Sequence, residues 1–315
     1  MVKIACVFPG QGAQQVGMGS DLLAQSAEAK KKFSAADTRL GYALTDLIMN
    51  GPEDQLTLTE NTQPAILAVS CILYDALRLH GLSPDYVAGH SLGEYSALYA
   101  AGVFSFEDAI FAVRQRGLLM EQAVPAGAGT MAAVLGLAPD ALEAICQKLS
   151  SEGQAVQLAN LNAPGQIVIS GSAAGVSQAS ALANAAGARR VVPLAVSGPF
   201  HSSLMKPAAE AMRAVLANLR IHDAQIPVIA NCSADAETEA SIICDNLISQ
   251  LYSPVRWVES VERLKAAGVD TYIEVGPGRV LSGLIKKIHR GARILSVHDL
   301  ASLDDTIAQL KEAAK

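Results

Sequence analysis

The sequence Gly89-His90-Ser91-Leu92-Gly93 follows a short apolar run, Tyr86 to Ala88, and continues into a segment with helical character that ends at Ala101. The apolar run predicts a strand, so the Gly-x-Ser-x-Gly pattern stands in the strand–turn–helix setting that a nucleophile elbow needs. Its glycines permit a tight turn, and Ser91 falls at the helix N-terminus, where unpaired N–H groups favour negative charge. We therefore predict a nucleophilic Ser91. The alternative is an ordinary glycine-rich turn from strand to helix.

Around this turn, short apolar segments alternate with longer helical ones. Such an alternation is typical of an α/β protein with a mainly parallel sheet. Two helices are predicted, at Phe106 to Gln122 and at Pro64 to His80, with Pro64 in the first turn of its helix. Further strands are predicted at Lys3 to Phe8, Val228 to Ala230, Tyr272 to Val275 and Ile294 to Val297.

The middle of the chain follows a different order, strand–helix–strand–strand–helix–strand, which is the ferredoxin-like arrangement. Its strands are predicted at Thr130 to Leu137, Ala155 to Leu161, Gln166 to Ser170 and Arg189 to Val196, and its helices at Pro139 to Leu149 and Ala173 to Ala185. Pro125 and Gly198-Pro199 punctuate its two ends. We predict a larger α/β domain, residues 1–126 and 198–315, with an inserted ferredoxin-like subdomain, residues 127–197. A cleft between the two parts is the expected ligand site.

Composition and charge restrict the function classes. The chain has 315 residues, is 50% hydrophobic and carries a formal net charge of −6, which argues against a general nucleic-acid binder. The five cysteines form no Cys-x-x-Cys pair, so neither a disulfide framework nor a zinc site is expected, and a reducing cytoplasm fits. The apolar start of the chain is broken too soon for a signal peptide, and no apolar run is long enough to cross a membrane.

A serine nucleophile needs a base, and His201 is the best placed of the six histidines. It lies in the loop Ser197 to Ser202, where the insertion rejoins the larger domain and a side chain can reach the cleft. The alternative is a solvent-exposed loop histidine. The remaining histidines lie at a helix end, in strand-like segments, in a basic run or beside the serine: His80, His222, His298, His289 and His90.

No acidic residue between Ser91 and His201 stands at a strand end, where the acid that orients a catalytic histidine is usually found. We therefore expect a Ser–His pair whose imidazole N–H is held by a backbone carbonyl. Backbone N–H groups of the loop Phe8-Pro9-Gly10-Gln11-Gly12 could serve as oxyanion donors. A dinucleotide site in this loop is not expected, because Gln15 stands where the third glycine of that fingerprint belongs.

Two arginines, Arg114 and Arg116, occupy the otherwise apolar helix from Phe106 to Gln122. A buried arginine needs an anion, because leaving its charge unpaired is costly. That anion could be a structural carboxylate or the carboxylate of a substrate, and the periodicity does not choose between the two anions or the two arginines.

Taken together, these segments resemble the malonyl-CoA:acyl carrier protein transacylases of fatty-acid synthesis, and the likeness runs from end to end. The segments that carry it are Phe8 to Gly12, Asn61-Thr-Gln-Pro64, Gly89 to Ala97, Arg116-Gly117, Asn162-Ala-Pro-Gly-Gln166, His201 with Leu204-Met-Lys-Pro207, Gln250-Leu-Tyr-Ser-Pro254 and Glu274-Val-Gly-Pro-Gly278. The resemblance implies an α/β-hydrolase-like large domain with a parallel sheet and a ferredoxin-like insert.

The resemblance also implies roles for single residues. Ser91 is the nucleophile, His201 the base, and the main-chain carbonyl of Gln250 orients His201. Further implied roles are the oxyanion-hole N–H groups of Gln11 and Leu92, the malonyl carboxylate for Arg116, acyl selection for Phe200, and the cleft lining for Gln63, Asn160, Asn162 and Gln166.

The expected reaction moves a malonyl group from malonyl-CoA to the phosphopantetheine thiol of acyl carrier protein through an acyl-serine, with no metal or redox cofactor. A cytoplasmic monomer is expected. Because carrier proteins of such pathways are acidic, docking requires a basic surface, either Lys286, Lys287, His289 and Arg290 or Arg189 and Arg190. The alternatives are a serine thioesterase or esterase, an acyltransferase of polyketide synthesis, and a non-catalytic α/β binding protein.

Overall fold

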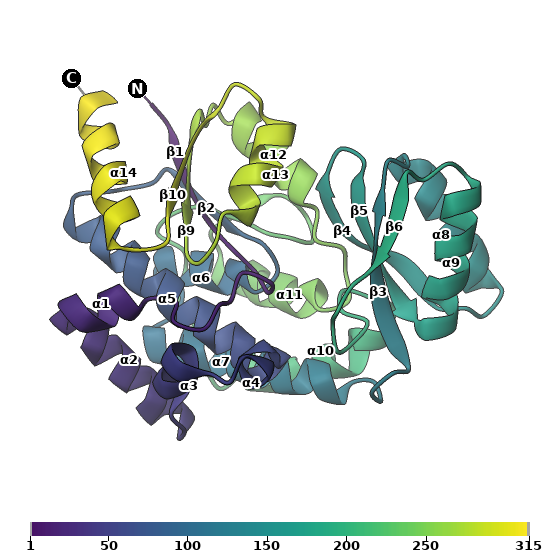
Figure 1. Ribbon diagram of the computed structural model, residues 1–315, viewed down its shortest axis with the longest axis horizontal. Helices are drawn as coiled ribbons and strands as arrows, with labels where there is room; N and C mark the ends of the chain where they lie inside the picture. Colours follow the sequence, from purple (N-terminus) through teal and green to yellow (C-terminus); the bar gives the residue numbers. More distant parts are fainter. Residues whose placement is uncertain (1, 314–315) are drawn as a thin grey trace.

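The computed structural model describes residues 2–313 and shows two sheets that lie side by side, with helices packed on them (Figure 1). Among these residues, no helix is both long and apolar enough to span a membrane. The structure has the predicted fold class, an α/β protein with a parallel sheet and a smaller ferredoxin-like part.

The first sheet has the strand order β10-β9-β1-β2-β7-β8, and its pairs are parallel except for the antiparallel pair of β7 and β8. Its strands are β1 (Ile4–Phe8), β2 (Tyr86–Gly89), β7 (Val228–Ile229), β8 (Ala236–Glu237), β9 (Thr271–Val275) and β10 (Arg293–Val297). Both β1 and β2 end at the same edge of the sheet, since Phe8 pairs with Gly89. The loops that follow these two strands therefore meet.

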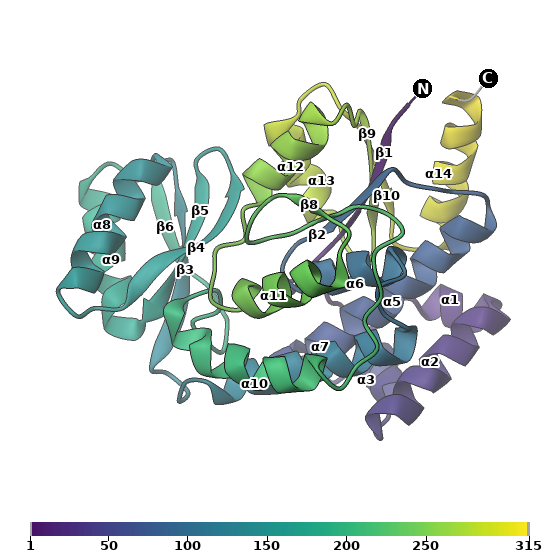
Figure 2. The same ribbon diagram turned by 180° about the vertical axis from the view of Figure 1, so that it is seen from behind.

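Alternate residues of β1 face opposite layers of helices, as expected for a strand buried on both sides. Cys6 and Phe8 pack with the layer of α5, whereas Ala5 and Val7 pack with α12 and α13. Figure 2, seen from behind, shows α10 beside both α7 and α11. The helices are α1 (Ser20–Gln25), α2 (Ala27–Leu40), α3 (Leu44–Asn50), α4 (Glu53–Thr57), α5 (Thr59–Leu79), α6 (Gly93–Ala100), α7 (Phe106–Gln122), the short 3₁₀ helix η1 (Ser203–Met205), α10 (Lys206–Leu216), α11 (Ala240–Gln250), α12 (Trp257–Ala266), α13 (Val280–Ile288) and α14 (Leu300–Ala313).

The second sheet is antiparallel, with the strand order β4-β5-β3-β6 that a ferredoxin-like unit has. Its elements are β3 (Gly129–Leu135), α8 (Pro139–Ser151), β4 (Val156–Ala163), β5 (Gln166–Ser172), α9 (Ala173–Ala185) and β6 (Arg190–Pro193). All of them fall within the predicted insertion. Its bounds, 127–197, stay a prediction, and residues 1 and 314–315 of the predicted larger domain lie outside the described residues.

Backbone hydrogen bonds tie the second sheet to the rest of the molecule. The N–H of Leu161 on β4 donates to the Val255 carbonyl over 2.9 Å, and the Val255 N–H donates to the Ala159 carbonyl over 2.8 Å. Val255 lies just before α12. The two parts of the molecule are therefore joined by main-chain hydrogen bonds between β4 and Val255 as well as by the two segments that link the insertion to the larger part.

The helix predicted from Pro64 begins earlier, at Thr59, so the prediction that Pro64 lies in the first turn is wrong. A proline within a helix leaves the carbonyl four residues before it without its usual N–H donor. Here that carbonyl belongs to Glu60, and it accepts a hydrogen bond from Arg114 Nη1 at 2.8 Å. A side chain from α7 thus replaces the missing donor, which a local sequence pattern does not reveal.

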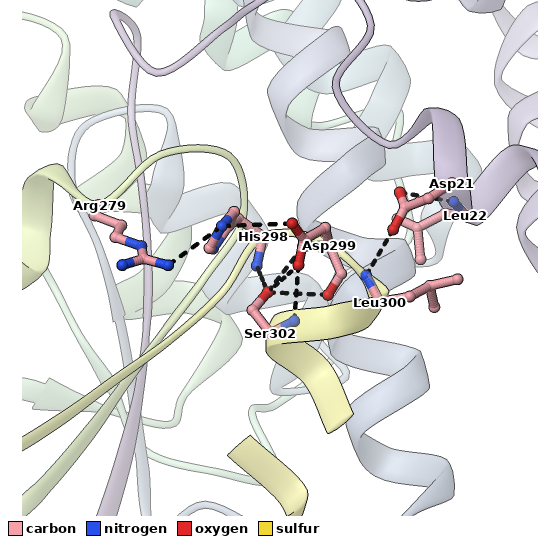
Figure 3. A network of polar contacts seen from close by, with 7 residues as sticks. All are labelled: Asp21, Leu22, Arg279, His298, Asp299, Leu300 and Ser302. Atoms are coloured by element: carbon pink, nitrogen blue, oxygen red, sulfur yellow. Dashed lines mark hydrogen bonds and ion pairs between the residues drawn. The ribbon is translucent and has the colours of Figure 1, made fainter. Parts of the chain in front are cut away.

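The last helix, α14, starts at a polar cluster that joins it to the N-terminal part of the chain (Figure 3). The Leu300 N–H donates to Asp21 Oδ2 on α1 over 2.7 Å. Ser302 Oγ accepts from the N–H of His298, which follows β10, and the Asp299 side chain accepts from the Ser302 N–H over 2.8 Å. These bonds satisfy N–H groups at the helix start and hold α14 beside α1.

The turn at Ser91 depends on the absence of side chains at Gly89 and Gly93. A Cβ on Gly89 would lie 1.9 Å from the Gly93 carbonyl carbon, and a Cβ on Gly93 would lie 2.1 Å from the Phe8 carbonyl oxygen. Ser91 itself has φ of 52°, in the left-handed region that side chains other than glycine rarely adopt. The elbow is therefore packed between β1 and α6 at van der Waals contact.

We expect Gly89→Ala to destabilise the protein by about 3 kcal/mol or more, because backbone atoms must move to admit the methyl group. Gly291→Ala is the matched control, since a Cβ there meets nothing within 4 Å. Thermal and urea unfolding measure both variants. Equal stability of the two variants would contradict the packing described for the elbow.

Candidate active site

Ser91 and His201 meet at the cleft between the two sheets. Ser91 lies at the turn between β2 and α6, and His201 lies in the loop before η1. The distance from Ser91 Oγ to His201 Nε2 is 2.7 Å. His201 is 3% exposed, so it is not a solvent-exposed loop histidine. Its φ of 58° places a second left-handed backbone beside that of Ser91, and such strain is concentrated at functional sites.

The other ring nitrogen of His201 fixes its protonation pattern. Nδ1 lies 2.8 Å from the Gln250 main-chain carbonyl, which can only accept a hydrogen bond. Nδ1 therefore carries the hydrogen, and Nε2 is left to accept the Ser91 hydroxyl. Burial, and then the charge of Arg116, lower the pKa of His201 to about 3. The ring is consequently neutral near pH 7 and can act as a base.

Two main-chain N–H groups near Ser91 are free to donate. Gln11 follows β1 and Leu92 precedes α6, and both line the same cavity as Ser91. Within residues 2–313, neither N–H donates to another protein group. Leu92 lies at a helix N-terminus, where the dipole also favours an anion.

Arg116, rather than Arg114, points at the serine. Its Nη2 donates to Ser91 Oγ at 3.1 Å and to Gln250 Oε1 at 2.8 Å, and its Nη1 donates to Gln63 Oε1 at 2.9 Å. The side chain is 1% exposed, and within the described chain it forms no ion pair with a carboxylate. Arg114 instead bonds Glu60 and Asn61, which gives it a structural environment.

A cavity of about 230 Å³ opens over Ser91. Among the residues that the sequence analysis placed in the cleft, those on the cavity wall are Gln11, Leu92, Arg116, Asn160, Asn162, Gln166 and Phe200. Gln63 differs, because it lies behind Arg116 and is 1% exposed. The rest of the wall is largely apolar and includes Met120, Met131, Val168, Leu194 and Val196.

His90 does not face His201. Its Nε2 lies 2.8 Å from Asn162 Oδ1, and its ring packs against Trp257. Burial lowers the pKa of His90, so this ring is also neutral near pH 7. The contact holds Asn162 at the cavity wall.

Sequence reasoning missed two residues at the elbow, Asn231 and Glu94. Asn231 Oδ1 accepts from the Ser91 N–H at 2.6 Å, and its Nδ2 donates to the Gly89 carbonyl at 2.6 Å. A signal existed, because Asn231 follows the strand β7 and carboxyl ends of adjacent parallel strands meet at one edge. Glu94 is 3% exposed, and it is the one charged residue of the buried helix α6.

These features define an α/β enzyme that forms an acyl-serine: a hydroxyl bonded to a neutral imidazole, two free N–H donors beside it, and a buried cation suited to an anionic acyl group. The comparisons agree. The chain matches the acyl transferase domain family over residues 5–303. It is similar to the malonyl CoA-acyl carrier protein transacylase of Bacillus subtilis (strain 168), with 54% identity over 312 residues, 99% of this chain and 98% of the relative.

Solved structures give the same result. An acyl carrier protein S-malonyltransferase from Vibrio cholerae superposes with a TM-score of 0.94 at 49% identity, over 96% of this chain and 99% of that one. A malonyl-transacylase in complex with its type II PKS acyl-carrier protein has a TM-score of 0.94 at 43% identity, over 98% and 99% of the two chains. The chain belongs to the malonyl CoA-acyl carrier protein transacylases of the acyl transferase family, and the predicted resemblance is confirmed.

The low pKa of His201 predicts how Ser91 reactivity depends on pH. A small fluorophosphonate should modify Ser91 at a nearly constant rate from about pH 8 to about pH 5, whereas a base with the ordinary histidine pKa would lose about thirtyfold. The rate is measured by intact-protein mass spectrometry. Ser91→Ala is the control and should not be modified. A rate that titrates near the ordinary histidine pKa would contradict the described environment of His201.

Proposed function

We propose that this chain moves the malonyl group of malonyl-CoA to the phosphopantetheine thiol of acyl carrier protein through a malonyl ester of Ser91. The observation that supports this most is the position of the Ser91 hydroxyl. It lies 2.7 Å from the neutral imidazole of His201 and 3.1 Å from the buried guanidinium of Arg116. A base and a carboxylate-binding cation thus flank one nucleophile.

In the first step, His201 Nε2 takes the hydroxyl proton as Ser91 Oγ attacks the thioester carbonyl. The oxyanion that forms accepts hydrogen bonds from the Gln11 and Leu92 N–H groups, and loss of one such donor costs about 3 kcal/mol of barrier. The Gln250 carbonyl accepts from Nδ1–H and stabilises the imidazolium. That imidazolium protonates the departing sulfur of CoA.

In the second step, His201 takes the proton of the carrier-protein thiol as the sulfur attacks the malonyl ester. The bond from the acyl carbon to Ser91 Oγ then breaks, and the imidazolium returns the proton to Oγ. Transfer must be faster than hydrolysis, so the acyl group must be shielded from water. The apolar wall of Met120, Met131, Val168 and Phe200 supports such shielding. Every step uses side chains and N–H groups of this chain, so we propose that no metal or redox cofactor takes part.

Arg116 gives the site its preference for a carboxylated acyl group. Its guanidinium forms a planar fork that suits a carboxylate. Because Nη2 reaches Ser91 Oγ, a malonyl group esterified there has its free carboxylate within reach of the fork. Phe200 is also part of the cavity wall, and Asn160, Asn162 and Gln166 offer amide groups to the acyl group or the pantetheine arm.

The proposal extends to the assembly state, the cellular setting and the pathway. We propose that the protein acts as a monomer. The cysteines Cys6, Cys71, Cys146, Cys232 and Cys244 are free, which supports a reducing cytoplasm. Fatty-acid synthesis is the proposed pathway, and a polyketide carrier protein is the alternative acceptor.

A basic surface lies beside the cavity mouth. Lys286, Lys287 and Arg290 are exposed at the end of α13, whose first residue, Val280, lines the cavity. Lys287 Nζ donates to Gln166 Oε1 on the cavity wall at 3.0 Å. We therefore place the acidic carrier protein on this surface rather than on Arg189 and Arg190.

Brief incubation with malonyl-CoA followed by peptide mass spectrometry tests the reaction. We expect a malonyl adduct on Ser91 that persists without a thiol acceptor and disappears when the carrier protein is added. Ser91→Ala should give no adduct. Rapid hydrolysis of the adduct would favour the thioesterase alternative, and no adduct in the wild type would favour a binding protein.

Arg116→Ala tests the carboxylate contact. The rate of malonyl transfer relative to acetyl transfer should fall about tenfold or more, which corresponds to the loss of one hydrogen bond to a charged group.

Reversing the charge at Lys286 and Lys287 tests the docking surface. In the double variant Lys286→Glu/Lys287→Glu, the KM for carrier protein should rise several-fold, because the new negative charges repel an acidic partner. The rise should be larger at low salt. Malonylation of Ser91 by a short N-acetylcysteamine thioester, which has no phosphates, should be unaffected. Glutamate at Arg189 and Arg190 is the matched control. A KM that changes only in that control would contradict the Lys286 and Lys287 surface and would place docking at Arg189 and Arg190.

A further inference from the structure

The guanidinium of Arg116 is held by neutral groups. Its Nη1 donates to the amide oxygen of Gln63 at 2.9 Å, and its Nη2 donates to the amide oxygen of Gln250 at 2.8 Å. Its Nε is buried and has no partner among the described residues. A buried arginine usually has a carboxylate against it, since an uncompensated charge in the interior is costly. A carboxylate that compensates the Arg116 charge is therefore expected close by, though not in direct contact.

Glu94 supplies a buried carboxylate on the far side of Gln250. Its Oε2 accepts from Gln250 Nε2 at 2.7 Å. The side-chain amide of Gln250 thus lies between the two charges, with its oxygen toward Arg116 and its nitrogen toward Glu94. It cannot be reversed, because a guanidinium only donates hydrogen bonds and a carboxylate only accepts them.

We infer that Glu94 is the counter-charge of Arg116 and that the Gln250 side chain keeps the two apart, so that the guanidinium is fixed in place but stays open to the carboxylate of an acyl group. Glu94 and Gln250 are then specificity-determining residues. The inference rests on the proposed malonyl transfer and adds two side chains to it.

A direct ion pair would oppose substrate binding. If a protein carboxylate lay against the guanidinium, the malonyl carboxylate would have to displace it or share the fork with it. Separation by one amide weakens the attraction between the protein charges, because the Coulomb energy falls with distance. The amide dipole still links them. Burial raises the pKa of Glu94 to about 7, although Gln250, Asn231 and Arg116 act in the opposite direction, as expected for a carboxylate whose compensation is incomplete.

The same carboxylate also supports the nucleophile. Glu94 Oε2 accepts from the Asn231 N–H at 3.2 Å, and the Asn231 side chain holds the Ser91 N–H and the Gly89 carbonyl. Removing the carboxylate together with its acceptor atoms would disturb this turn. An exchange of carboxylate and amide leaves an acceptor oxygen at residue 94. It also removes the 3.0 Å hydrogen bond from Gln250 Nε2 to the Ser91 carbonyl, so the ratio of malonyl to acetyl transfer, rather than either rate alone, reports the effect of the charge.

The test exchanges the two groups. The double variant Glu94→Gln/Gln250→Glu keeps the net charge and the chain lengths but puts the carboxylate directly against Arg116. The Gln250 main-chain carbonyl that orients His201 is unchanged. We expect the ratio of malonyl to acetyl kcat/KM to fall at least tenfold, because the fork is already occupied. Glu94→Gln alone is the matched control, and its ratio should stay the same or rise, because only the opposing charge is lost.

Several outcomes overturn the inference. A double variant that keeps the malonyl preference within about threefold would show that a carboxylate at residue 250 does not block the fork. If a thermal melt shows no folded state for the double variant, the test rests on Glu94→Gln alone. A fall of threefold or more in its ratio of malonyl to acetyl kcat/KM then contradicts the role assigned to the Glu94 charge. A wild-type protein that forms no malonyl adduct on Ser91 overturns the proposed function and this inference together, whereas an adduct with an unchanged ratio overturns only the inference.

Discussion

The tight packing of the backbone at Gly89 and Gly93 is the constraint on which the site depends. These two residues let the turn after β2 lie against β1 and let α6 start directly after Ser91. The close fit places the Ser91 hydroxyl, the Leu92 N–H and the loop of Gln11 at one edge of the parallel sheet. A larger residue in the turn would displace the Ser91 hydroxyl and the Leu92 N–H together, since both belong to the same few peptide units.

The base reaches this edge because the second sheet is anchored to the first part of the molecule. On β4, Gln157 Oε1 accepts from the Ser203 N–H at 2.8 Å, and its Nε2 donates to the His201 carbonyl at 3.3 Å. Main-chain bonds between β4 and Val255 fix the strand itself. The left-handed backbone of His201 is therefore held by its surroundings, and the 2.7 Å contact with Ser91 needs no closure of the cleft.

Local patterns predicted α7 from Phe106 to Gln122, as the structure has it. They gave no prediction for α1 to α4, α10, α11 and α12. Local patterns failed where distant residues decide. Pro64 lies inside α5 because Arg114 bonds the carbonyl that the proline leaves free. Helical spacing could not separate Arg114 from Arg116, since the choice depends on which acceptors other elements present. Asn231 was missed although it follows a predicted strand, because its role also requires that β7 pair with β2, and local patterns do not show which strands are neighbours.

Within residues 2–313, His201 Nδ1 bonds a main-chain carbonyl and no carboxylate, which has a consequence for the proposed reaction. A carbonyl stabilises the imidazolium less than a carboxylate does, and the positive charge of Arg116 further lowers the pKa of this ring. That second effect persists because the Gln250 amide separates Glu94 from the guanidinium, so that Glu94 offsets the charge only in part. In the proposed reaction, a malonyl carboxylate bound to Arg116 offsets its charge and so raises the basicity of His201, whereas an acetyl group leaves the charge in place. In the proposed reaction, Arg116 therefore favours the dicarboxylic acyl group in two ways. It binds the carboxylate, and once bound it lowers the pKa of His201 less.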